Sequence, residues 1–105
     1  MGEYVKVADL DSIKPGQARC VTAGARRVAL FNHEGTLYAI DDQCTHVGGP
    51  LSEGFCENGV VVCPWHGAQF RLRDGLVLGP PARRSVKAYP VRTTSGTIEI
   101  DLGEG

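Results

Sequence analysis

Four side chains in the middle of the chain can bind a soft metal, and they come in two short boxes. The first box contains Cys44 and His46, and the second contains Cys63 and His66. Sixteen residues separate His46 from Cys63. Thiolates and imidazoles are ligands that zinc and iron–sulfur centres share. The pattern therefore predicts that the two boxes hold one metal or iron–sulfur centre and that the rest of the chain supports it.

Both boxes are expected to lie on loops, because glycine and proline interrupt them. Residues 48–50 (Gly-Gly-Pro) end the first box, and Pro64 and Gly67 break the second. Between the boxes, residues 55–57 and 60–62 flank Asn58-Gly59, which is a strong signal for a two-residue hairpin. That hairpin would bring the two ligand loops side by side.

The remaining chain is predicted to form short strands separated by turns. Expected hairpins join residues 27–32 to 36–40, 70–73 to 76–78 and 86–91 to 97–102, while residues 4–8 and 18–21 form further strands. Residues 8–13 are ambiguous and form at most a short helical turn. Fourteen glycines and six prolines favour a turn-rich structure over a helical bundle. We therefore expect an all-β fold in one antiparallel domain, residues 1–105, with roughly eight to ten strands and no convincing helix.

The composition excludes several functional classes. With a net charge of −1 and no basic stripe, the chain is not expected to bind nucleic acid. Its apolar runs are too short to span a membrane, and no signal peptide is recognisable, so we expect a cytoplasmic monomer. Cysteines stay reduced in that compartment, which favours ligands or buried thiols over disulfides. Cys20 and Cys56 are expected to be small buried residues, and His33 a solvated loop residue.

Three kinds of site remain compatible with the two boxes. A structural zinc site uses such ligands, although zinc fingers have wider spacings than Cys-x-His. A disulfide with incidental histidines would leave the pairing of Cys with His unexplained. A [2Fe–2S] cluster with two cysteines on one iron and two histidines on the other suits the mixed boxes, since each loop then supplies one ligand to each iron.

At this point the chain resembles a known family, the Rieske iron–sulfur proteins. The resemblance rests on Cys44-Thr45-His46, the gap, and Cys63-Pro64-Trp65-His66-Gly67. It implies a Rieske fold of stacked antiparallel β-sheets, with a small cluster-binding subdomain, about residues 42–81, inserted in a β base. It also implies one [2Fe–2S] cluster with the cofactor-binding ligands Cys44, His46, Cys63 and His66.

The sequence differs from one branch of that family at several positions, which shows which branch it resembles more. Respiratory-complex members carry an extra bridged cysteine in each box, where this chain has Gly49 and Trp65. They also place Ser and Tyr hydroxyls near the cluster sulfurs, where this chain has Ala68 and Phe70, which cannot donate hydrogen bonds. The expected reduction potential is therefore toward the low end of the Rieske range, roughly −150 mV. The chain looks instead like the soluble ferredoxins of bacterial ring-hydroxylating oxygenases, with the nitrite reductase small subunit as a neighbour.

The resemblance implies an electron carrier and not an enzyme. An oxygenase needs a second iron, commonly held by two histidines and a carboxylate, and only His33 remains after the cluster has taken two. We expect a one-electron carrier between an NAD(P)H-dependent ferredoxin reductase and a terminal oxygenase. The alternatives are a small Rieske subunit of a nitrite reductase-like enzyme and, from another class, a zinc-stabilised interaction module.

Docking is expected near His46 and His66. The residues expected to form an apolar rim there are Val47, Pro50, Leu51, Trp65, Pro80 and Pro81. Asp41, Asp42 and Glu53 are expected to pair with a basic reductase surface. The basic pairs at 26–27, 71/73 and 83–84 are expected to be solvated, with one of them steering an acidic partner.

Overall fold

The computed structural model describes residues 4–24, 26–43, 50–65, 67–79 and 84–102. Within these ranges the chain forms antiparallel β-strands, two short 3₁₀ helices and no α-helix, which confirms the all-β prediction. Helix η1 (Leu10–Ser12) lies in the stretch expected to form a helical turn, whereas η2 (Leu51–Glu53) was not anticipated. Neither of these described helices has the length and apolar character needed to cross a membrane.

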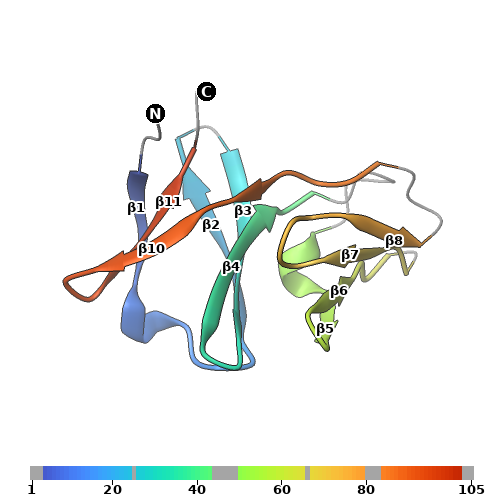
Figure 1. Ribbon diagram of the computed structural model, residues 1–105, viewed down its shortest axis with the longest axis horizontal. Coiled ribbons are helices and arrows are strands. Elements are labelled where there is room, and N and C mark those ends of the chain that lie inside the picture. Colours follow the sequence, from blue (N-terminus) through green and yellow to red (C-terminus); the bar gives the residue numbers. More distant parts are fainter. Residues whose placement is uncertain (1–3, 25, 44–49, 66, 80–83, 103–105) are drawn as a thin grey trace.

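The strands form three stacked sheets (Figure 1). The first sheet has the order β1 (Tyr4–Asp9), β11 (Thr97–Asp101), β10 (Val91–Thr94). The middle sheet has the order β2 (Ala18–Ala23), β3 (Arg26–His33), β4 (Thr36–Asp41), β9 (Ala88–Tyr89). The third sheet has the order β5 (Phe55–Glu57), β6 (Val60–Val62), β7 (Gln69–Arg71), β8 (Val77–Gly79).

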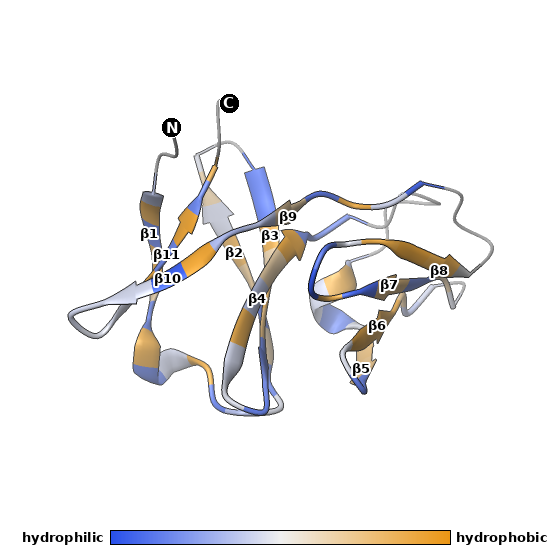
Figure 2. Ribbon diagram, viewed as in Figure 1, coloured by the Kyte–Doolittle hydropathy of each residue, from blue (hydrophilic) through white to orange (hydrophobic). Residues whose placement is uncertain are grey.

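The middle sheet is buried on both faces, because β3 carries apolar residues at successive positions. Side chains alternate between the faces of a strand. Val28 and Leu30 therefore enter one core, shared with the first sheet, while Ala29 and Phe31 enter the other, shared with the third sheet. Figure 2 shows these apolar strands in orange. We name the second core the site core; it contains Ala29, Phe31, Ile40, Leu51, Val61, Cys63, Ala68, Phe70, Leu72 and Val86.

Three hairpins turn through two residues that both have positive φ. The φ angles are 55° and 77° at Asn58-Gly59, 55° and 92° at Glu34-Gly35, and 51° and 80° at Ser95-Gly96. This is the geometry of type I′ turns, which match the twist of antiparallel strands. The hairpins predicted around these three glycines are therefore present, with strand ends shifted by a few residues.

The predicted single strand over residues 86–91 is wrong, because Pro90 divides it. Residues 88–89 form β9 and pair with β4, whereas β10 begins at Val91 and pairs with β11. Proline has no N–H to donate to a ladder. The carbonyl of Pro90 still accepts a 3.0 Å hydrogen bond from the Asp101 N–H. The chain thus passes from the middle sheet to the first sheet at this residue.

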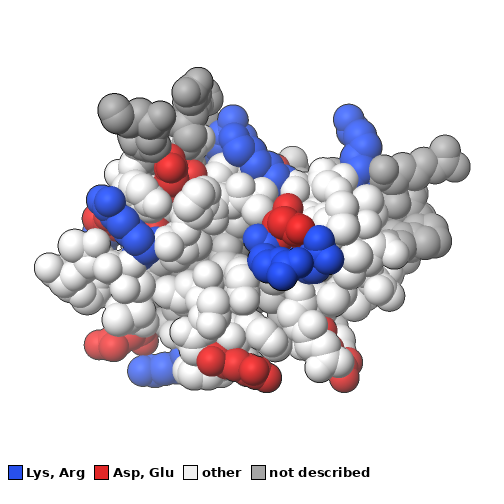
Figure 3. Space-filling view, in the orientation of Figure 1, with Lys and Arg blue, Asp and Glu red and all other residues white. Residues whose placement is uncertain are grey.

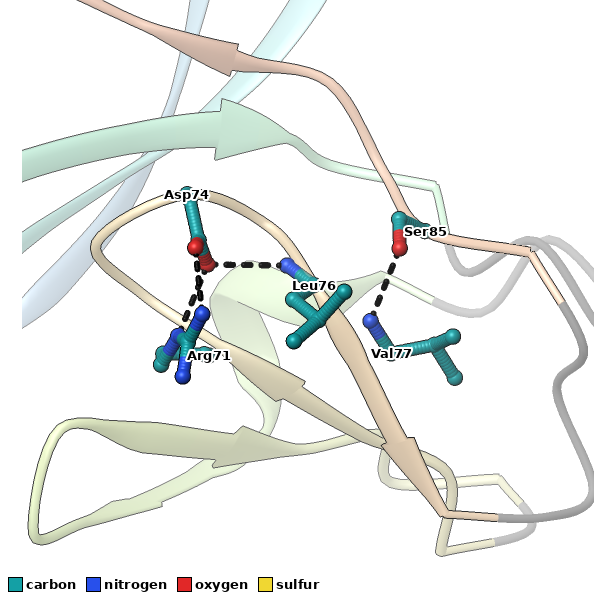
Figure 4. Close-up of polar contacts among 5 residues, drawn as sticks. All are labelled: Arg71, Asp74, Leu76, Val77 and Ser85. Atoms are coloured by element: carbon teal, nitrogen blue, oxygen red, sulfur yellow. Dashed lines mark hydrogen bonds and ion pairs between the residues drawn. The ribbon is translucent and has the colours of Figure 1, made fainter.

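Residues 84–87, here called the return segment, fasten the third sheet to the rest of the molecule. The Val86 N–H donates to the Gly75 carbonyl at 2.9 Å, and the Val77 N–H donates to Ser85 Oγ at 2.9 Å (Figure 4). At its far end, the Lys87 carbonyl accepts a hydrogen bond from the Asp41 N–H of the middle sheet. The approach at Gly75 is so close that an added Cβ would lie 2.1 Å from the Val86 carbonyl oxygen.

Candidate metal centre

The second box begins with a buried thiol at the end of β6. The side chain of Cys63 is 2% exposed and belongs to the site core. Its backbone closes a tight turn, because its N–H donates to the Ala68 carbonyl at 2.7 Å and its carbonyl accepts from the Gly67 N–H at 3.1 Å. Gly67 has a φ of 78°, a conformation in which glycine has no steric cost. The Cys63 sulfur forms no disulfide and is thus available as a thiolate ligand.

The residues on either side of the first box are hydrogen-bonded to each other. Gln43 and Pro50 form an isolated antiparallel bridge, and the Leu51 N–H donates to the Asp42 carbonyl at 2.6 Å. Leu51 then enters the site core together with Cys63. The base of the first loop and the first predicted ligand of the second loop therefore rest on the same core.

A buried carboxylate secures the base of the first loop. Asp42 is 1% exposed, and its Oδ1 accepts a hydrogen bond from the Ser52 N–H at 2.8 Å. Its Oδ2 lies 3.6 Å from Arg27 Nη2, and its own N–H donates to the Arg27 carbonyl. The expectation that Asp42 pairs with a reductase is therefore wrong, since the side chain is turned inward. Sequence reasoning missed this role because Arg27 and Ser52 are distant in the chain.

Asp41, the neighbour of Asp42, is also engaged within the protein. The Tyr89 hydroxyl donates to Asp41 Oδ1 at 2.5 Å and accepts from Arg26 Nη1 at 3.2 Å. Burial, together with the adjacent carboxylate of Asp41, raises the pKa of Tyr89 to about 12. This contact links β4 and β9 directly before the first ligand loop. Glu53 is exposed at the end of η2, so its expected surface position is confirmed.

Three of the four predicted ligands, Cys44, His46 and His66, lie outside the described residues, as do Val47, Gly49, Pro80 and Pro81. Among the other rim residues, Trp65 is exposed over 56% of its surface and Pro50 is half-buried. The prediction that Leu51 forms part of the rim is wrong. Its side chain is fully buried because it anchors η2 in the site core.

The side chains beside Cys63 offer no hydrogen-bond donor. Ala68 and Phe70 are both fully buried and belong to the site core with Cys63. A methyl group and a phenyl ring present only carbon to their surroundings. The described residues around Cys63 are thus apolar and offer no side-chain hydrogen bond to sulfur. This agrees with the predicted low reduction potential.

The remaining cysteines and His33 differ in part from expectation. Cys20 is exposed, because on β2 the inward positions are Val21 and Ala23. Its sulfur accepts a long hydrogen bond of 3.8 Å from Arg27 Nη2. Cys56 is half-buried, and burial raises the pKa of its thiol. His33 ends β3 and is half-buried instead of being fully solvated.

The residues fit a centre with thiolate and imidazole ligands. Across the described ranges, no group of three or more His, Cys, Asp or Glu side chains gathers into another metal site. Cys63 is a buried soft donor at the mouth of a closed turn, and the first loop is pinched directly beside it. Two loops that each carry one Cys and one His can hold a two-iron cluster from both sides.

Comparison with known proteins decides among the alternatives. Residues 3–90 match the Rieske [2Fe-2S] domain family. This chain belongs to the Rieske family. The biphenyl dioxygenase ferredoxin subunit of Pseudomonas sp. (strain KKS102) is 37% identical over 100 residues, 94% of this chain and 92% of that protein.

Solved structures agree with this assignment. The Sphingomonas yanoikuyae B1 ferredoxin superposes with a TM-score of 0.88 at 27% identity, over 95% of this chain and 99% of that chain. A chain in the complex of reduced oxygenase and oxidized ferredoxin in carbazole 1,9a-dioxygenase superposes with a TM-score of 0.86 at 29% identity, over 93% of this chain and 92% of that chain. This Rieske protein therefore carries one [2Fe–2S] cluster and acts as an electron carrier, not as a catalytic enzyme. The zinc interpretation is set aside.

Proposed function

We propose that this Rieske protein is the ferredoxin of a multicomponent ring-hydroxylating dioxygenase. It takes single electrons from an NAD(P)H-dependent reductase and passes them to the terminal oxygenase. The observation that carries the proposal is the match to dioxygenase ferredoxin subunits over nearly the whole length of both chains. A cytoplasmic location and a monomeric state are part of the proposal, because both partners must meet the protein in turn.

The proposed ligands are Cys44 and Cys63 for one iron and His46 and His66 for the other. A cluster with two thiolates and two neutral imidazoles supplies one-electron chemistry, being neutral when oxidised and carrying one negative charge when reduced. The ligands would lie in a cluster-binding subdomain of about residues 42–81 within a single domain of residues 1–105. The pinched loop base and the closed turn at Cys63 support this division.

The side chains around the ligands have two tasks in this proposal. Ala68 and Phe70 exclude water from the inner side of Cys63 without donating a hydrogen bond to sulfur, which keeps the potential low. On the outer side, Trp65 is exposed next to His66 in the chain and offers a flat apolar surface to a partner. In this proposal the partner docks near His46 and His66 and contacts the exposed face of Trp65.

Visible absorption and low-temperature EPR of the dithionite-reduced protein test the cofactor. We expect the spectrum of a mixed-ligand [2Fe–2S] centre, whereas a colourless, zinc-loaded and EPR-silent preparation would reject it. Turnover with the reductase and oxygenase encoded by the neighbouring genes tests the partners. Omission of the ferredoxin should abolish coupled substrate oxidation, and undiminished turnover without it would reject the proposed role.

A further inference from the structure

Positive charge is concentrated in one stretch of this weakly acidic chain. Residues 71–87 contain five Arg or Lys and a single Asp, although the whole chain has a net charge of −1. That stretch therefore has a formal charge of +4, and the remainder of the chain has −5. Of the basic residues, Arg83 lies outside the described part. We name the other four the basic strip: Arg71, Arg73, Arg84 and Lys87.

Tertiary contacts bring the two halves of the basic strip onto the same side of the third sheet. Arg71 and Arg73 lie on the turn from β7 to β8, and Arg84 and Lys87 lie at the two ends of the return segment. The hydrogen bond from Val86 N–H to Gly75 holds these segments together, as does the one from Val77 N–H to Ser85, which Figure 4 shows. Arg73, Arg84 and Lys87 are exposed, and the charges of Arg73 and Lys87 face solvent.

The one acidic residue of this turn is already engaged. Asp74 forms a two-pronged ion pair with Arg71, with distances of 2.9 Å from Nε to Oδ1 and 2.5 Å from Nη2 to Oδ2. Its Oδ1 also accepts the Leu76 N–H at 3.1 Å, and these contacts lower the pKa of Asp74 to about 2. The carboxylate thus offsets one guanidinium and keeps the turn ordered, while the strip as a whole retains a formal charge of +3.

The basic strip lies along β7, β8 and the return segment, on the opposite edge of the third sheet from Glu57. β7 leads back to the turn of Cys63, since Gln69 follows Ala68 and pairs with Gly79 of β8. Glu57 lies on β5, which is the opposite edge of the sheet from β8. Figure 3 shows blue surface over the β7–β8 turn with one red group against it, and further red surface at the lower edge, toward β5. The length of β7, Gln69–Arg71, separates this positive turn from the turn of Cys63.

We propose that the basic strip steers an acidic surface of the electron-donating reductase toward the third sheet, the part of this protein that carries the turn of Cys63. The proposal rests on the proposed function as an electron carrier. An acidic surface attracts the more positive redox form, which is the oxidised one, because reduction adds one negative charge. The strip therefore favours docking of the oxidised carrier on its donor and release after reduction. An acceptor would need the opposite preference.

Flavin radicals generated by a laser flash provide the probe. The FMN semiquinone carries a phosphate and imitates an acidic flavoprotein, while the lumiflavin semiquinone has no phosphate. Between about 0.01 M and about 0.15 M ionic strength, where the Debye length shrinks from ~30 to ~8 Å, we expect the rate constant for reduction by FMN to fall about three- to tenfold. The rate constant with lumiflavin should stay flat.

R73E/K87E and K14E/R19E change the net charge equally, so comparing them shows whether the salt dependence comes from the basic strip. In R73E/K87E the FMN rate constant should rise with salt, and in R73Q/K87Q its salt dependence should be about two-thirds shallower, because one of three formal positive charges remains. K14E/R19E reverses two exposed charges on and before β2, the opposite edge of the middle sheet from β9, and should retain the wild-type fall. A flat or rising rate constant for the wild type, or equal effects of the two charge reversals, overturns the proposal.

Oxidation of the reduced protein by hexacyanoferrate(III) tests whether the basic strip serves the electron donor and not the acceptor. The rate constant of the reduced form should depend on salt about a third less steeply, per unit of probe charge, than that of the oxidised form. The reason is that the added electron offsets one of the three formal positive charges. A slope as steep as that of the oxidised form overturns the assignment to the donor. A preparation that lacks the visible and EPR signals of the cluster overturns the proposed function, whereas a cluster-loaded protein with flat slopes overturns the basic strip alone.

Discussion

Replacing Ala68 by serine is expected to raise the reduction potential of the centre. Ala68 is fully buried, and its carbonyl oxygen accepts the 2.7 Å hydrogen bond from the N–H of Cys63. Its methyl group therefore lies in the turn that holds a proposed ligand. A serine hydroxyl at this place can donate a hydrogen bond to a sulfur, and that bond strengthens when reduction makes the sulfur more negative.

The size of the shift follows from the strength of one hydrogen bond. If the hydroxyl bonds the reduced state more strongly by about 1 kcal/mol, the one-electron potential rises by about 40 mV, because ~1.4 kcal/mol corresponds to ~59 mV. The wild-type potential from which this shift is measured is expected near the low end of the Rieske range, roughly −150 mV.

A redox titration followed by visible absorption measures both values. The matched control is A29S, because Ala29 is equally buried in the site core but lies on β3 of the middle sheet. A29S should lose about 1–3 kcal/mol of unfolding free energy, from a buried hydroxyl, without a change in potential. An unchanged or lower potential in cluster-loaded A68S would refute the reasoning, as would an equal rise in A29S. A wild-type potential above about +100 mV would refute its premise.

Three further predictions concern the fold and the ligands. G75A should lower the free energy of unfolding in urea by at least about 2 kcal/mol, since its Cβ would meet a carbonyl oxygen at 2.1 Å and its φ is +76°; G35A, with φ +92° and open space, should lose clearly less, and equal losses would contradict the steric argument. Because the pKa of Tyr89 is raised to about 12 in the folded state, its contribution to stability is complete below about pH 10 and is lost as pH rises toward 12. The stability gap between wild type and Y89F should therefore shrink between pH 9 and 12, and a constant gap would disprove the linkage. C44S should lose the visible spectrum while C56A keeps it; bleaching in C56A would show that the ligand assignment is wrong.

Local features of the fold were predictable because each depends on a few adjacent residues. Asn58-Gly59 forms a two-residue turn since both residue types tolerate positive φ, and Gly96 supplies that freedom in the turn of Ser95-Gly96. The antiparallel all-β class follows from the same turn signals between short apolar runs. The strand expected over residues 86–91 failed because its two halves pair with different sheets on either side of Pro90. Such a change of partner leaves little trace in local apolar periodicity.

The sequence pattern predicted the burial of individual side chains less well than it predicted the turns. Leu51 follows a Gly-Gly-Pro loop and was expected on the surface, yet η2 directs it into the site core. Cys20 was expected to be buried, yet the register of β2 on β3 turns it outward while Val21 and Ala23 face the core. For Leu51 the deciding contacts come from strands remote in sequence, and for Cys20 the exposure depends on which strands cover that part of the sheet.

The sequence by itself determined the kind of chemistry that this protein supports. Two Cys/His boxes at short spacing predict a mixed soft-ligand centre, and Ala68 and Phe70 offer no side-chain hydrogen-bond donor because of their residue types alone. Only the tertiary structure decided that Asp42 points inward to secure the first loop, and that the turn after β7 meets the return segment to form the basic strip. The physical reason is that ligand chemistry resides in single side chains. Burial and the summed field of several charges depend instead on which distant segments pack together.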